Sequence, residues 1–121
     1  MRIFLCVVII YMVLLTNPIA ASAYDSKEDL TNVFVEANQL YSETSFKEAV
    51  TLYEKILDTG YESAPLYYNL GNNYFKIGSL GKAILSYERS KRLNPGDGDL
   101  ISNLDFAYSL VKEPNMERTR L

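Results

Sequence analysis

The 121-residue sequence contains no histidine, no tryptophan and a single cysteine, Cys6, which lies in an apolar run near the N-terminus. Without histidine or a second cysteine, the chain cannot form the Ser-His or Cys-His pairs of nucleophilic catalysis, an intrachain disulfide or a typical zinc site. Carboxylate pairs remain the one plausible source of acid–base chemistry, and no pattern brings such a pair together. We therefore expect no catalytic residues, no cofactor and no metal.

Positively charged residues are also fewer than negatively charged ones. Twelve Lys and Arg residues stand against fifteen Asp and Glu residues, which gives a formal net charge of -3. A chain without a basic patch cannot neutralise many phosphates, so nucleic acid is excluded as a partner. The length and the 48% share of hydrophobic residues fit one small globular domain.

The longest hydrophobic run is too short to cross a membrane. It comprises thirteen residues from Ile3 to Leu15, after the positive charge of Arg2, and is followed by the small-x-small sequence Ala21-Ser22-Ala23. This is the pattern of a signal peptide over residues 1–23, with cleavage before Tyr24. The alternative is an uncleaved N-terminal membrane anchor, although a span needs roughly 20 apolar residues. We expect an exported protein, periplasmic or associated with the cell envelope.

The remainder of the chain repeats with a period of about 34 residues, a length typical of a solenoid built from helix-turn-helix units. The matching pairs are Ala37 and Gly71, Asn38 and Asn72, Tyr41 and Phe75, Ala49 and Ala83, Tyr53 and Tyr87, Tyr67 and Ile101, Asn69 and Asn103, and Leu70 and Leu104. The pattern gives two full repeats, about 30–63 and 64–97, followed by the first helix of a third.

Helix signals recur within each repeat. Apolar residues spaced by three and four predict helices near 27–42, 46–58, 64–77, 80–93 and 98–112. Ser45-x-x-Glu48 predicts a capping box, and Ser63 followed by Pro65 predicts another helix start. Small residues Ala49, Gly71 and Ala83 are expected where paired helices cross. The predicted fold is all-α, a row of helix-turn-helix units over residues 24–112 with a frayed tail at 113–121.

The second repeat resembles the tetratricopeptide repeat (TPR). The resemblance rests on Tyr67-Tyr68-Asn69-Leu70-Gly71-Asn72-Asn73-Tyr74, on Ala83, on Tyr87, and on the closing Asn94-Pro95. The first repeat departs from the consensus, since Glu36 replaces Leu, Thr44 replaces Gly and Tyr61 replaces Pro. This resemblance implies that the helix-turn-helix units form a right-handed superhelix, two repeats plus a C-terminal helix. It also implies a non-catalytic module that binds other proteins.

A closer resemblance is to the exported TPR protein of bacterial aerotolerance (Bat) operons. It rests on Ala37-Asn38-Gln39-Leu40-Tyr41, on 66–72 and on the signal peptide ahead of them. The resemblance implies partners of the von Willebrand factor A type or proteins associated with MoxR-type ATPases. Members of that family continue into transmembrane and SH3-like segments. This chain stops at Leu121, so we interpret it as a truncated relative.

Helices in equivalent positions of successive repeats would line one concave face. The residues predicted to bind a peptide or partner there are Asn38, Tyr41, Tyr68, Asn69, Asn72, Phe75, Lys76 and Asn103, with Phe34 and Phe106 beside them. Asparagine both donates and accepts, so these side chains suit the backbone of an extended peptide, and the aromatic residues suit its apolar side chains. The alternative is that the asparagines bond neighbouring helices and the aromatic residues cover the core.

The charges and the small number of repeats lead to two more expectations. TPR proteins that bind chaperone tails hold a C-terminal carboxylate with Lys and Arg, but Phe34, Asp99 and Asn103 stand at those positions here. We therefore expect no high-affinity binding of free acidic C-termini. A solenoid of fewer than about three repeats also leaves an apolar edge, predicted around Ile101, Leu104, Tyr108 and Leu110, through which the chain would form a homodimer.

Overall fold

The computed structural model describes residues 27–112. The predicted signal peptide and the predicted tail lie outside this range. The described residues form five α-helices, namely α2 (Lys27–Ser42), α3 (Phe46–Asp58), α4 (Ala64–Lys76), α5 (Leu80–Leu93) and α6 (Gly98–Lys112). The predicted all-α fold is therefore confirmed. None of these helices is long and apolar enough to span a membrane.

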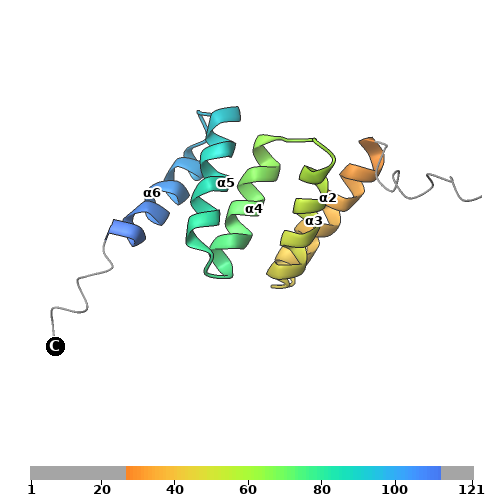
Figure 1. The fold of residues 1–121 in the computed structure, drawn as a ribbon, viewed down its shortest axis with the longest axis horizontal. Helices are drawn as coiled ribbons and strands as arrows, with labels where there is room; N and C mark the ends of the chain where they lie inside the picture. The colour runs from red at the N-terminus through yellow and green to blue at the C-terminus, as the bar shows by residue number, and fades with distance from the viewer. Residues whose placement is uncertain (1–26, 113–121) are drawn as a thin grey trace, which may run out of the picture.

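The helices follow one another in a row, as Figure 1 shows from α2 in orange to α6 in blue. Helices α2 and α3 form one antiparallel hairpin, α4 and α5 form a second, and α6 packs against α5. Helix α4 also contacts both helices of the first hairpin. Each helix is thus stabilised mainly by its neighbours in sequence, as expected for a helical repeat.

The turn inside each hairpin closes in the same way. The Ser45 amide donates to the Leu40 carbonyl at 2.9 Å, and the Ser79 amide donates to the Tyr74 carbonyl at 2.9 Å. These bonds define a Schellman motif, which needs a residue in the left-handed conformation just after the helix. That residue is Thr44, with φ 64°, in the first hairpin and Gly78, with φ 80°, in the second.

The helix starts differ from the prediction at one position. The Ser63 side chain accepts a bond from the Leu66 amide at 3.3 Å, and Pro65 lies in the first turn of α4, as predicted. Ser45, however, makes no side-chain capping bond, so the predicted capping box with Glu48 is wrong. The Schellman motif fixes the Ser45 backbone at φ -84° and ψ 61°, outside the extended conformation in which a serine usually caps.

Small side chains lie where the paired helices cross. Ala49 and Ala83 are completely buried, in agreement with the prediction. Gly71 faces the ring of Tyr87 so closely that an added Cβ would lie 2.6 Å from two of its carbons. Large side chains fill the remaining core, among them Tyr53, Tyr87, Ile56, Leu66 and Leu100.

Helix α6 contributes both to the core and to an exposed edge. Leu104 was expected on the apolar edge, but it is only 2% exposed and joins the core with Leu100 and Ala107. It lies one repeat period after Leu70, which is buried in the same core. The exposed apolar side chains of α6 are Phe106, Tyr108, Leu110 and Val111.

Candidate binding groove

Two adjoining pockets lie on the face formed by α2, α4 and α6. The smaller, of about 190 Å³, is lined by Asn38, Tyr41, Tyr53, Asn69 and Asn72. The larger, of about 350 Å³, is lined by Tyr41, Tyr68, Asn72, Phe75, Lys76, Tyr87, Asn103 and Phe106. Tyr41 and Asn72 line both pockets, so together they form one groove. All eight residues predicted to bind a partner line this groove, and their binding role remains a prediction.

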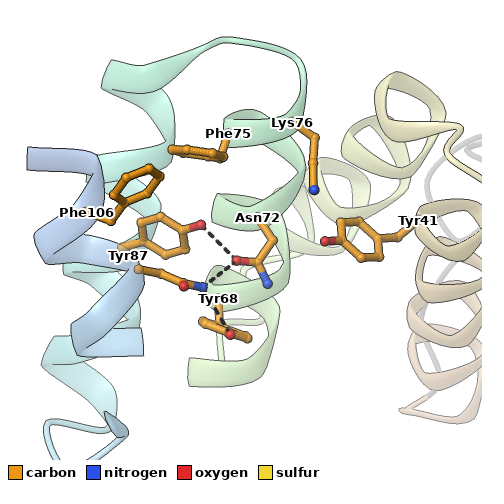
Figure 2. A pocket seen from close by; sticks show the side chains of 8 residues that line it. Tyr41, Tyr68, Asn72, Phe75, Lys76, Tyr87 and Phe106 are labelled. Atoms are coloured by element: carbon orange, nitrogen blue, oxygen red, sulfur yellow. Dashed lines mark hydrogen bonds between the residues drawn. The ribbon is translucent and has the colours of Figure 1, made fainter. Parts of the chain in front are cut away.

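Two triads of side chains hold the groove together. In the first, the Tyr53 hydroxyl and the Asn69 amide donate to Oδ1 of Asn38, at 2.6 Å and 2.8 Å. In the second, the Tyr87 hydroxyl and the Asn103 amide donate to Oδ1 of Asn72, at 2.8 Å and 3.2 Å (Figure 2). Corresponding members lie one repeat period apart, so the same hydrogen-bond pattern occurs in both repeats.

The triads show that the asparagines bond neighbouring helices with some of their polar atoms and leave others free. Oδ1 of Asn38 and of Asn72 is used by two donors each, as the structural interpretation of these residues requires. The Nδ2 groups of Asn38 and Asn72 have no hydrogen-bond partner among residues 27–112. The Oδ1 atoms of Asn69 and Asn103 have none there either. Each triad therefore presents one free donor and one free acceptor.

Tyr53 and Tyr87 were not predicted to belong to the groove, because both lie on the second helix of a repeat. Both are nearly inaccessible to solvent. Burial raises the pKa of Tyr53 to about 12, and it also raises the pKa of Tyr87. Both hydroxyls therefore stay protonated, and remain hydrogen-bond donors, to a higher pH than an exposed tyrosine would. The missed signal was their equal spacing in sequence, 15 residues after Asn38 and after Asn72.

The larger pocket has an apolar side and a polar side. The rings of Phe75 and Phe106 lie side by side, with centroids 5.8 Å apart. Opposite them, Lys76 and Tyr41 extend toward the space beside Asn72 (Figure 2). Asn103 donates to the Tyr68 hydroxyl at 3.2 Å, which fixes that ring at the bottom of the pocket in this view.

Phe34, which was expected beside the groove, lies elsewhere. Its ring packs edge-on against Tyr53, with centroids 5.8 Å apart. Phe34 lines a separate, largely apolar pocket of about 620 Å³ between the first half of α2 and the segment that leads into α4. It lines neither pocket of the groove, because its position on α2 places it nearer that segment.

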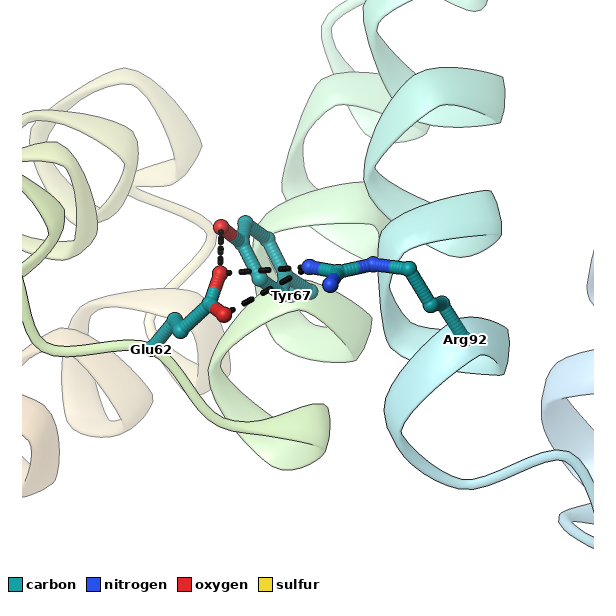
Figure 3. Close-up of polar contacts among 3 residues, drawn as sticks. All are labelled: Glu62, Tyr67 and Arg92. Carbon is teal, nitrogen blue, oxygen red and sulfur yellow. Dashed lines mark hydrogen bonds and ion pairs between the residues drawn. The ribbon is translucent and has the colours of Figure 1, made fainter.

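Polar contacts outside the groove join neighbouring helices. The carboxylate of Glu62 accepts bonds from the Tyr67 hydroxyl at 2.8 Å and from Arg92 at 3.3 Å (Figure 3). Tyr74 donates to Glu54, and Tyr108 donates to Glu88 at 2.9 Å. Glu54 and Glu88 thereby connect successive repeats. Among residues 27–112, no group of three or more acidic side chains suits a metal ion.

Comparison with known proteins agrees with this architecture. A family model described as tetratricopeptide repeat matches residues 64–97, which include α4 and α5. Among solved structures, a chain of the CopN-Scc3 complex is similar, with a TM-score of 0.69 and 20% sequence identity. The similarity covers 80% of this chain and 60% of that chain, and at this identity it concerns the fold alone. No curated protein matches the chain. Residues 64–97 are thus similar to a TPR unit and lie within an all-α helical repeat.

Proposed function

We propose that this chain is a non-catalytic scaffold that binds an extended segment of a partner protein in the groove across α2, α4 and α6. The observation that carries this proposal is the free hydrogen-bonding capacity of the two triads. Asn38 and Asn72 each keep a donor, and Asn69 and Asn103 each keep an acceptor. The backbone of a peptide offers the complementary groups at every residue.

The shape of the groove supports an extended ligand. Its two pockets adjoin at Tyr41 and Asn72, and they succeed one another along the row of helices. Because the triads also hold the helices in place, their carboxamides are already oriented before a ligand arrives. Pre-oriented groups lose little conformational freedom on binding, which favours affinity.

A finer proposal places this scaffold in the cell envelope, within an assembly of the Bat aerotolerance type. It is supported by the signal-peptide pattern of residues 1–23 and by the resemblance of 37–41 and 66–72 to that family. The partners would then be proteins of the von Willebrand factor A type or proteins associated with MoxR-type ATPases. Contact with the membrane itself would require an uncleaved N-terminal segment.

A crosslinking pull-down from the native envelope fraction tests the groove. The bait is the full chain, compared with Phe106→Ala in the groove and with Leu110→Ala as a matched control. Both side chains lie on α6 and are exposed, by 56% and 45%, but Leu110 lines neither pocket. We expect Phe106→Ala to lose the captured partner and Leu110→Ala to retain it. Capture that is lost only with Leu110→Ala would move the binding site to the outer edge of α6.

A second candidate function is homo-oligomerisation through that edge. Tyr108, Leu110 and Val111 are 37%, 45% and 51% exposed and lie close together in the sequence of α6. Grouped apolar residues of this kind often mark an interface. Sedimentation of the full chain over a range of concentrations tests it, with Val111→Lys as the variant. A monomer at every concentration would rule this candidate out.

A further inference from the structure

The groove has a charge distribution unlike that of the rest of the chain. The sequence contains fifteen acidic residues, yet no aspartate or glutamate lines either pocket. The single charged side chain among the lining residues is Lys76. Within residues 27–112, Lys76 forms neither an ion pair nor a hydrogen bond, since the ion pair found there joins Arg92 and Glu62. The groove therefore carries an uncompensated positive charge on an acidic protein.

Neutral donors surround this charge. The Asn72 oxygen already accepts two bonds, so the free half of that carboxamide is its Nδ2 donor. The Tyr41 hydroxyl has no hydrogen-bond partner among residues 27–112. In Figure 2 the Lys76 ammonium, the Asn72 nitrogen and the Tyr41 hydroxyl border the same space between α2 and α4. One cation with neutral N–H and O–H donors is a set that suits a carboxylate.

An apolar wall stands next to these donors. Phe75 and Phe106 line the same pocket as Lys76, and Phe106 is 56% exposed. Side chains two residues apart on an extended peptide project to the same side. A peptide in the groove would therefore place one residue among the donors and another, two positions away, against the rings.

We infer that the groove selects partner segments in which an aspartate or glutamate lies two residues from a large apolar residue. The carboxylate is held by Lys76, Asn72 and Tyr41, and the apolar side chain contacts Phe75 and Phe106. This inference rests on the proposed function of the groove. The recognised group is an internal acidic side chain, since a single lysine does not supply the several cations that hold a free C-terminus.

A random peptide library displayed on phage and selected against the full chain tests the inference. We expect the recovered peptides to share an acidic residue spaced two positions from a large apolar residue. Binding of one such peptide, and of its form with Gln or Asn in place of the acid, is then measured by fluorescence anisotropy. Lys76→Ala is the test variant, and Lys55→Ala, at another exposed lysine in the last turn of its helix, is the matched control.

Lys76→Ala is expected to weaken binding of the acidic peptide about three- to fivefold, because an exposed ion pair contributes modestly. It should leave the neutral peptide unchanged, as should Lys55→Ala for both peptides. Lys76→Glu should weaken the acidic peptide by about tenfold and favour its Lys-substituted form instead. The difference between acidic and neutral peptides should also shrink as salt rises from about 0.01 M to about 0.15 M.

The possible failures are distinct. Two results would overturn the acidic preference and leave the groove intact. In the first, the peptides lose binding with Phe106→Ala but carry no acid. In the second, they lose binding with Phe106→Ala but bind Lys76→Ala as well as they bind the original chain. Peptides that bind the Phe106→Ala variant unchanged overturn the groove itself, as does the recovery of no peptide. Circular dichroism of each variant verifies that the helices are retained.

Discussion

The two hairpins form the same turn and the same helix crossing with different residues. The first hairpin closes its turn with Thr44 at φ 64°, and the second uses Gly78 at φ 80°. The first has Ala37 at the position where the second has Gly71, which faces the Tyr87 ring. The hydrogen bonds of the triads are nevertheless equivalent. The comparison teaches that the architecture of the repeat depends on the spacing of a few contacts, while the consensus residues adjust how favourable each contact is.

The largest expected effect is one that the two hairpins share, a loss of stability at alkaline pH through their buried tyrosines. Burial raises the pKa of Tyr53 to about 12 and also raises the pKa of Tyr87. In the unfolded chain a tyrosine has a pKa near 10. The free energy of unfolding therefore has its full value below about pH 10 and falls as the pH rises through the folded pKa. The slope is at most about 1.4 kcal/mol per pH unit for each tyrosine.

We consequently expect the helices to unfold as tyrosine ionises above about pH 10. Circular dichroism and tyrosinate absorbance followed together against pH provide the measurement. Tyr87→Phe and Tyr53→Phe should each make the pH dependence less steep. Ionisation of every tyrosine near pH 10 with the helices intact would contradict this expectation.

The next largest effect is expected from exchanging the small residues Ala37 and Gly71. In Gly71→Ala, the new Cβ would lie 2.6 Å from two carbons of Tyr87, whose hydroxyl is bonded to Asn72. We expect this overpacking to outweigh the gain in helix propensity and to lower the free energy of unfolding by about 2 kcal/mol. Ala37→Gly is the reciprocal change, and its expected cost is about 1 kcal/mol. Urea unfolding of both variants gives the comparison. A stabilised Gly71→Ala variant would show that the Tyr87 ring moves aside without cost.

The turns should respond in opposite directions. A non-glycine residue in the left-handed region carries a cost of about 1 kcal/mol or more. Thr44→Gly is therefore expected to raise the free energy of unfolding by about 1 kcal/mol, and Gly78→Thr to lower it by a similar amount. Thermal unfolding of the two variants measures the difference. Equal effects of the same sign would mean that the two turns are not equivalent.

The smallest expected effect concerns the helix starts. Ser63 caps α4 through a bond of 3.3 Å, and Ser45 makes no such bond. Because the bond is long, Ser63→Ala should cost about 0.5 kcal/mol, at the low end of the range for capping serines. Ser45→Ala should change stability by less than that. Chemical unfolding with both variants in parallel tests the contrast, and a larger loss with Ser45→Ala would contradict it.

Most of the fold could be predicted because it depends on spacing. The repeat period and the apolar pattern at intervals of three and four place the helix boundaries within a residue of those observed. The same period places Asn38 and Asn72 at one position of the first helices and Asn69 and Asn103 at another, so the lining of the groove was largely predictable. These features require only that equivalent residues occupy equivalent positions.

What could not be predicted depends on how side chains meet after packing. The period does not reveal that Tyr53 and Tyr87 donate to asparagine, because this requires the rotamers of residues on different helices. Ser45 has a typical capping sequence, but the end of the preceding helix determines its backbone. Likewise, Leu104 and Phe34 lie on helices as predicted, but the neighbours available to each helix decide which side chains are buried.

The triads also specify what a designer would have to change to lengthen this solenoid. Continuing the pattern of Asn38 and Asn72 would require asparagine at 106, and continuing that of Ala37 and Gly71 would require a small residue at 105. The chain has Phe106 and Asp105 there. By analogy with Gly71 and Tyr87, the Asp105 side chain would occupy the space that a third tyrosine ring needs. A second helix patterned on α3 and α5, added after α6, should therefore pack on α6 cooperatively only after both positions are replaced, by Asp105→Gly and Phe106→Asn.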